Sequence, residues 1–180
     1  LGGSAGGTGG VQVSEAVTQL IERAEAAKRG ETIVTSTGMK DFDHRIMGYM
    51  PTRLGIIAGR PGMGKTVLMT ESARRVAMRS SLQLNPSERI AVGFLSCEIA
   101  MDELTARLVA GGSFDTWKVV YKDIVSGSFD ADLVDRTIVH LRHARDRLKA
   151  YPLYVEFTPG ISALEVAGRV RMMKARAQRE

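Results

Sequence analysis

The sequence predicts an α/β fold in which a parallel sheet is flanked by helices, and three observations support this prediction. From residue 31 onward, apolar runs of strand length alternate with amphipathic segments of helix length, as in β-α-β connections. A glycine-rich turn at residues 59–66 separates the first apolar run from the helix after it. The 180 residues are 44% hydrophobic and 25% charged, which suits a globular domain with one core.

The chain before residue 31 has a different character. Residues 1–12 are rich in glycine, and we expect them to be flexible because they cannot bury apolar surface. Residues 13–30 predict one amphipathic helix, which Gly30 ends. Its apolar stripe consists of Val17, Leu20, Ile21, Ala24 and Ala27. A lone helix of this length is marginal in water, so the stripe needs a surface on its own domain or on a neighbouring subunit.

Three strands and five helices are predicted after residue 31. Apolar runs place buried strands at residues 54–58, 90–96 and 153–157. Apolar periodicity and helix-ending residues place the helices at 67–79, 104–112, 117–125, 131–149 and along the last turns, where Val166, Val170, Met173 and Ala177 share a face. These elements agree with the alternating pattern of a parallel sheet.

The glycine-rich turn is a complete phosphate-binding loop. Its glycines let successive N–H groups curl around phosphate oxygens, and the helix that follows adds its positive end. Lys65 can reach the β and γ phosphates, and the Thr66 hydroxyl can ligate Mg²⁺. The sequence therefore predicts binding of a nucleoside triphosphate with Mg²⁺ by a set of nine residues: Gly59, Arg60, Pro61, Gly62, Met63, Gly64, Lys65, Thr66 and Val67.

Two further groups are candidates for function. Glu98 follows the second apolar run, where a carboxylate could orient water for phosphoryl transfer. The residue pattern alone equally allows an acid that favours the start of the next helix, as Asp102 and Glu103 do. The segment 117–122 interleaves Trp117 and Tyr121 with lysines, a weak signal for single-stranded nucleic acid.

Composition narrows the class of protein. The net charge is +5, and residues 131–180 hold ten Lys and Arg against six Asp and Glu, so a nucleic-acid partner and a solvated basic helix both fit. No apolar run approaches the roughly 20 residues of a membrane span. Cys97 is the lone cysteine and has no disulfide partner within the sequence, which indicates a reducing cytoplasm.

Four stretches of this sequence resemble the C-terminal ATPase domain of DnaB-type replicative DNA helicases, which belong to the RecA-like superfamily. They are Ser36-Thr37-Gly38 with Asp43, the run from Leu54 to Thr66, Phe94-Leu95-Ser96-Cys97-Glu98-Ile99, and the run from Pro152 to Ile161. The pairing of Arg60 with Pro61 in the phosphate loop is characteristic of this family. The resemblance covers nearly everything after residue 12.

The resemblance implies a RecA-like P-loop fold and an ATP-dependent DNA helicase that forms a hexameric ring. Glu98 would activate the attacking water and Lys65 would act on the phosphates, with ATP and Mg²⁺ as cofactors. Residues 13–30 would be a linker helix docked on the adjacent subunit, and residues 31–180 the N-terminal portion of the ATPase domain. Partners would be single-stranded or forked DNA and, in the cytoplasm at the replication fork, a primase and a helicase loader.

The resemblance also implies what to expect beyond residue 180. The strand with the second-motif aspartate, the DNA-binding loops and the arginine finger would lie there, so the sheet would be incomplete and residues 1–180 alone would be inactive. Two other interpretations remain open: a RecA-like recombinase or clock-type ATPase, and a nucleotide-gated assembly module that does not hydrolyse ATP.

Overall fold

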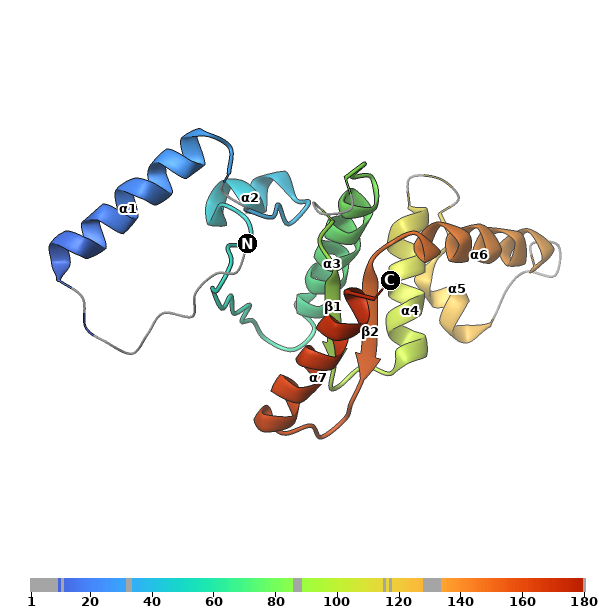
Figure 1. The fold of residues 1–180 in the computed structure, drawn as a ribbon. Helices are drawn as coiled ribbons and strands as arrows, with labels where there is room; N and C mark the ends of the chain where they lie inside the picture. Colours follow the sequence, from blue (N-terminus) through green and yellow to red (C-terminus); the bar gives the residue numbers. More distant parts are fainter. Residues whose placement is uncertain are drawn as a thin grey trace.

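The computed structural model describes residues 10, 12–31, 34–85, 89–114, 116, 118–127 and 134–179. Two strands and seven helices are found within these residues, and Figure 1 shows their arrangement. In chain order they are α1 (Val13–Lys28), α2 (Lys40–Ile46), α3 (Lys65–Ser81), β1 (Val92–Ser96), α4 (Met101–Ser113), α5 (Tyr121–Ser126), α6 (Val134–Lys149), β2 (Leu153–Phe157) and α7 (Ala163–Ala177).

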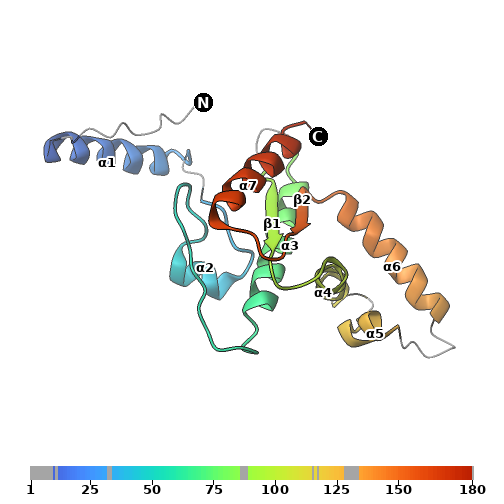
Figure 2. The same cartoon turned by 90° about the horizontal axis from the view of Figure 1, so that it is seen from below.

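The sheet consists of β1 and β2, which pair in parallel. The register runs from Val92 opposite Leu153 to Ser96 opposite Phe157. Helices α3 and α7 lie on opposite faces of the two strands (Figures 1 and 2), and Met173 of α7 lies against Gly93 of β1. The predicted parallel sheet flanked by helices is therefore confirmed, with two of its three predicted strands.

The prediction of a buried strand at residues 54–58 is wrong for this structure. The segment has no strand geometry, and Leu54 and Ile56 are 86% and 81% exposed. An apolar run forms a strand only where a neighbouring strand offers backbone partners, and among the described residues this segment is paired with none. The phosphate loop is therefore attached to the rest of the domain through α3.

The core lies between α3 and α4. Its buried apolar side chains are few, and Leu104 is the largest of them with no exposed surface. The set comprises Val76 and Ala77 of α3 with Leu104, Ala106, Leu108 and Val109 of α4. Helix α4 continues through Gly111 to Ser113, past the predicted end, and a Cβ at Gly111 would lie 2.9 Å from a carboxylate oxygen of Glu71. This glycine lets α4 approach α3 closely.

Residues 35–49 attach to α3 through hydrogen bonds from Ser72, Arg75 and Arg79 to residues 36–38, and Asp43 orders that turn. The Asp43 carboxylate accepts hydrogen bonds from the Ser36 hydroxyl (2.5 Å) and from the amide (2.8 Å) and hydroxyl (2.7 Å) of Thr37, which is fully buried. Burial alone would raise the pKa of Asp43, but these hydrogen bonds and the charge of Arg79 lower it overall. Asp43 therefore orders the turn at residues 36–38, and it lies on α2, a short helix that periodicity did not predict.

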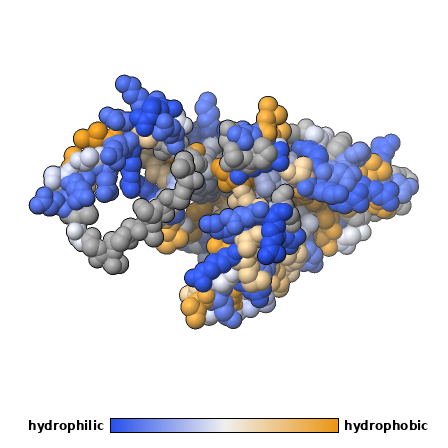
Figure 3. All heavy atoms as spheres, viewed as in Figure 1, coloured by the Kyte–Doolittle hydropathy of each residue, from blue (hydrophilic) through white to orange (hydrophobic). Residues whose placement is uncertain are grey.

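Helix α1 lies where the sequence predicts a helix, apart from the remaining elements (Figures 1 and 2). None of its residues is buried, and Val17, Leu20 and Ile21 are 46%, 61% and 54% exposed. Orange spheres over this region in Figure 3 show apolar side chains facing solvent. Within the described residues, the apolar stripe is not covered by its own domain.

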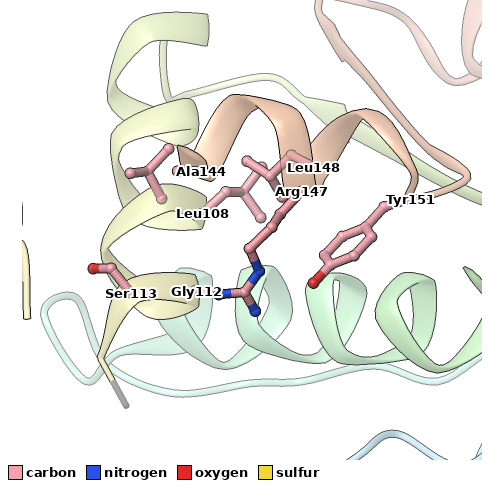
Figure 4. A pocket seen from close by; sticks show the side chains of 8 residues that line it. Leu108, Gly112, Ser113, Ala144, Arg147, Leu148 and Tyr151 are labelled. Atoms are coloured by element: carbon pink, nitrogen blue, oxygen red, sulfur yellow. The ribbon is translucent and has the colours of Figure 1, made fainter. Parts of the chain in front are cut away.

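Helix α6 packs against α4 with little space between them. Side chains of both helices meet there, including Leu108 and Leu148 (Figure 4), around a cavity of ≈ 20 Å³. That volume holds about one water molecule, so this crevice is packing and not a ligand site. In the part of the chain that is described, no helix is both long and apolar enough to cross a membrane.

Candidate functional site

The phosphate loop adopts a backbone that needs glycine at two positions. Gly62 and Gly64 have φ angles of 76° and 82°, in the left-handed region where a Cβ meets the following carbonyl. Successive residues in such conformations turn their N–H groups toward one side, which creates an anion-binding concavity. The positive φ angles at Gly62 and Gly64 agree with the tight turn that the glycine spacing predicts.

Helix α3 starts directly from this loop and presents an uncompensated positive end. Gly64 is its N-cap and gives no side-chain cap, and the first turn holds no acidic residue. Each of the other described helices has at least one acid in its first turn. The first N–H groups of α3 and its dipole are thus available to an anion at the loop.

Lys65 folds back over the loop. Its Nζ donates to the carbonyl oxygens of Gly59 (2.8 Å) and Arg60 (3.0 Å). An ammonium group has three donors on a flexible stem, so it can exchange these carbonyls for phosphate oxygens when a nucleotide enters. Gly59 and Arg60 thus hold the lysine at the loop through their backbones.

One cavity of ≈ 530 Å³ collects most of the predicted site. Eight residues line it: Pro61, Gly62, Gly64, Lys65, Thr66, Val67, Glu98 and Arg107. Of the predicted binding residues, Gly59, Arg60 and Met63 do not line this cavity, and the Met63 side chain is 72% exposed. The structure therefore brings the loop, the start of α3 and Glu98 together around one space.

Glu98 reaches this cavity from the turn between β1 and α4. Ser96, the last residue of β1, is buried and stabilises the turn: its Oγ donates to the Ile99 carbonyl oxygen (2.6 Å) and accepts from the Ile99 N–H (3.2 Å). Glu98 itself is exposed to solvent. Since parallel strands end at the same edge of a sheet, a residue after β1 belongs on the ligand-binding side of such a fold.

Arg107 is a residue of the cavity that sequence reasoning missed. It lies on α4, where its Nη2 donates to Glu103 (2.7 Å) and its guanidinium lies 4.8 Å from the centroid of the Tyr121 ring. The hydrogen bond to Glu103 raises the pKa of Arg107 above its ordinary value, against the opposing effect of burial. The sequence feature that could have pointed to Arg107 is its position about two turns into the predicted helix that follows Glu98.

The weak nucleic-acid signal at residues 117–122 gains no support from the site. The Tyr121 hydroxyl donates to Glu103 (3.0 Å), and its ring faces Arg107, so this aromatic residue packs within the domain. Trp117 lies outside the described residues.

The cavity has the donors for a Mg²⁺ ion carried by a nucleotide, but not for a metal held by protein alone. Among the residues that the structure describes, no three His, Cys, Asp or Glu side chains lie close enough together to bind a metal. Thr66 and Glu98 supply oxygens at the cavity wall. Mg²⁺ commonly binds through one or two protein oxygens, substrate phosphates and waters, which fits this donor set.

Comparison with known proteins agrees with the family resemblance seen in the sequence. The family model of the DnaB-like helicase C-terminal domain matches residues 35–180. The chain is 27% identical over 168 residues to the replicative DNA helicase DnaB of Leifsonia xyli, covering 92% of this chain and 33% of the relative. It is similar to DnaB of Rickettsia prowazekii (27% over 168 residues, 92% and 32%) and to the replicative DNA helicase DnaC of Bacillus subtilis (26% over 165 residues, 91% and 32%).

The chain thus spans about a third of the length of these relatives. The family match covers the phosphate loop, Glu98, both strands of the sheet and all helices after α1. The chain therefore belongs to the family of DnaB-like helicase C-terminal domains, an ATP-dependent helicase family with a RecA-like P-loop fold.

Proposed function

We propose that this chain binds ATP in the phosphate-loop cavity and hydrolyses it as part of a hexameric replicative DNA helicase. The observation that carries this proposal is the shared cavity: residues from the loop, from the start of α3 and from the turn after β1 line one space of ≈ 530 Å³. Phosphoryl transfer needs a positioned nucleophile and neutralised charge, and these residue types supply both.

Each residue has a role in this proposal. The backbone N–H groups from Gly62 to Thr66 cradle the phosphates, and Lys65 leaves the Gly59 and Arg60 carbonyls to bind the β and γ phosphates. Thr66 would hold Mg²⁺, which neutralises phosphate charge when bound. Glu98, which lines the same cavity from the turn after β1, orients and activates the attacking water.

Assembly and DNA contact complete the proposal. The exposed stripe of α1 supports docking of residues 13–30 on a second copy of the chain, with residues 31–180 as part of the ATPase domain. The relatives are named replicative DNA helicases, which supports action on single-stranded or forked DNA at the cytoplasmic replication fork. A primase and a helicase loader are further expected partners. DNA contact would use regions beyond residue 180.

The proposal is tested by exchanging Glu98 for Gln in the full-length protein. Glu98→Gln should bind ATP with Mg²⁺ as the wild type does but release phosphate roughly 10²- to 10⁴-fold more slowly, because the general base is lost. Asp102→Asn is the matched control, since this acid lies in the first turn of α4 and does not line the cavity. It should retain turnover.

Unwinding of a forked duplex by the same variants separates a helicase from other ATPases. Wild type and Asp102→Asn should unwind the fork, and Glu98→Gln should not. A Glu98→Gln protein that hydrolyses ATP at the wild-type rate would contradict the assigned role. A wild-type protein that binds ATP and never releases phosphate would instead favour the non-hydrolysing assembly module.

A further inference from the structure

Arg107 is placed in the phosphate-loop cavity by α4 and not by any part of the loop motif. Within the described lining, Arg107 and Lys65 are the cationic side chains, and Glu98 is the carboxylate. The side chain of Arg107 is 24% exposed, so most of it is shielded from solvent. A partly shielded cation interacts with an anionic ligand more strongly than a fully exposed one.

Neighbouring residues orient the guanidinium of Arg107, but they do not accept hydrogen bonds from all of its N–H groups. Glu103 accepts one of its hydrogen bonds, and its Cζ lies over the Tyr121 ring, 4.8 Å from the ring centroid. Its Nε is buried and lacks a hydrogen-bond partner among the described residues. A guanidinium has five N–H donors and Glu103 accepts from one of them, so donors remain for the oxygen acceptors of an anion in the cavity.

The position of Arg107 indicates which phosphate it faces. Glu98 and Arg107 both belong to the connection formed by the end of β1 and α4, whereas Lys65 and Thr66 belong to the loop and α3. If Glu98 prepares water for attack on the terminal phosphate, a cation that lines the same cavity from the helix following Glu98 is suited to that phosphate.

We propose that Arg107 binds the terminal phosphate of the nucleotide within its own chain, as a second side-chain cation beside Lys65. This inference rests on the proposed ATP site. Glu103 and Tyr121 act as positioning residues that hold the guanidinium at the cavity wall. The alternative is that Arg107 only packs α5 onto α4 through Tyr121, a role that does not depend on the number of phosphates bound.

The test compares a triphosphate with a diphosphate. Calorimetric titration of the full-length protein with Mg²⁺ and either a non-hydrolysable ATP analogue or ADP gives two affinities for each variant. For Arg107→Gln we expect roughly tenfold weaker binding of the ATP analogue, since a charge-assisted hydrogen bond is lost. The affinity for ADP should change less than about twofold, because ADP lacks the terminal phosphate.

Arg107→Lys and Arg142→Ala complete the set. Arg107→Lys keeps the positive charge and should recover part of the affinity for the triphosphate. Arg142 is an exposed residue of α6 that does not line the cavity. The Arg142→Ala control should therefore bind both nucleotides as the wild type does. If Arg107→Gln does not fold, a lower ATP-to-ADP affinity ratio in Arg107→Lys than in wild type still supports the inference, and an unchanged ratio contradicts it.

The outcomes distinguish this inference from the proposed function. Equal losses of ATP-analogue and ADP affinity, or no loss of either, would contradict the role of Arg107 and leave the ATP site intact. A wild-type protein that binds neither nucleotide would overturn the proposed function and the role of Arg107 together.

Discussion

Gly64→Ala is the sharpest test of the loop backbone, because this change adds strain without adding a clash. Gly64 has a φ of 82°, and a Cβ at this position would have no neighbouring atom within 4 Å. The cost is therefore that of placing an L-residue in the left-handed region, about 1–2 kcal/mol. We expect Gly64→Ala to lower the free energy of unfolding by about this amount.

Gly168→Ala is the matched control with the opposite expected sign. Gly168 lies inside α7 on the exposed surface, and a Cβ there also has open space. Alanine is a better helix former than glycine, so this variant should gain about 0.5–1 kcal/mol. The same chemical change should thus destabilise the protein at one glycine and stabilise it at the other.

Denaturant unfolding of the two full-length variants measures this contrast, and titration with Mg²⁺ and ATP measures its functional consequence. In Gly64→Ala, relaxation of the left-handed backbone would turn the N–H groups away from the cavity, so ATP binding should weaken in this variant and stay unchanged in Gly168→Ala. Equal stability changes in both variants, together with wild-type ATP affinity in Gly64→Ala, would show that the left-handed backbone has no role in binding.

Two further predictions concern stability. Leu104→Ala removes the largest fully buried apolar side chain and should cost about 2–5 kcal/mol in denaturant unfolding, whereas Leu164→Ala, at a residue 85% exposed, should cost little. The lowered pKa of Asp43 means that its stabilising effect is present above the unfolded carboxyl pKa of about 3.9 and is lost as the pH falls through the lower folded value. The stability difference between wild type and Asp43→Asn should therefore shrink as the pH falls from about 5 to 2. A difference that stays constant with pH would contradict the role of Asp43.

Local signals in the sequence predicted the parts of the fold that depend on neighbours in the chain. The glycine spacing predicted the turn at Gly62 and Gly64, and the apolar periods predicted α3, α7 and both paired strands. Glu98 was assigned to the nucleotide site through the family resemblance, and the structure has it in the lining of the loop cavity. These features need no knowledge of how distant segments pack.

Features that depend on distant segments were missed or wrong. The run 54–58 has strand composition, but its conformation depends on partners from other segments, and in this structure it is exposed. Helix α2 is seven residues long, too short for a periodic signal, and its carboxylate at Asp43 binds the preceding turn. Arg107 enters the site only because α4 packs beside α3, which no local pattern records.

Titration calorimetry of the full-length protein and its Lys65→Ala variant with Mg²⁺ and ATP decides whether the phosphate loop binds a nucleotide. We expect saturable binding by wild type and a large loss of affinity on removing the ammonium group that now bonds the Gly59 and Arg60 carbonyls. No binding heat in wild type, or equal affinity in both proteins, would contradict the assignment of this loop as the ATP site.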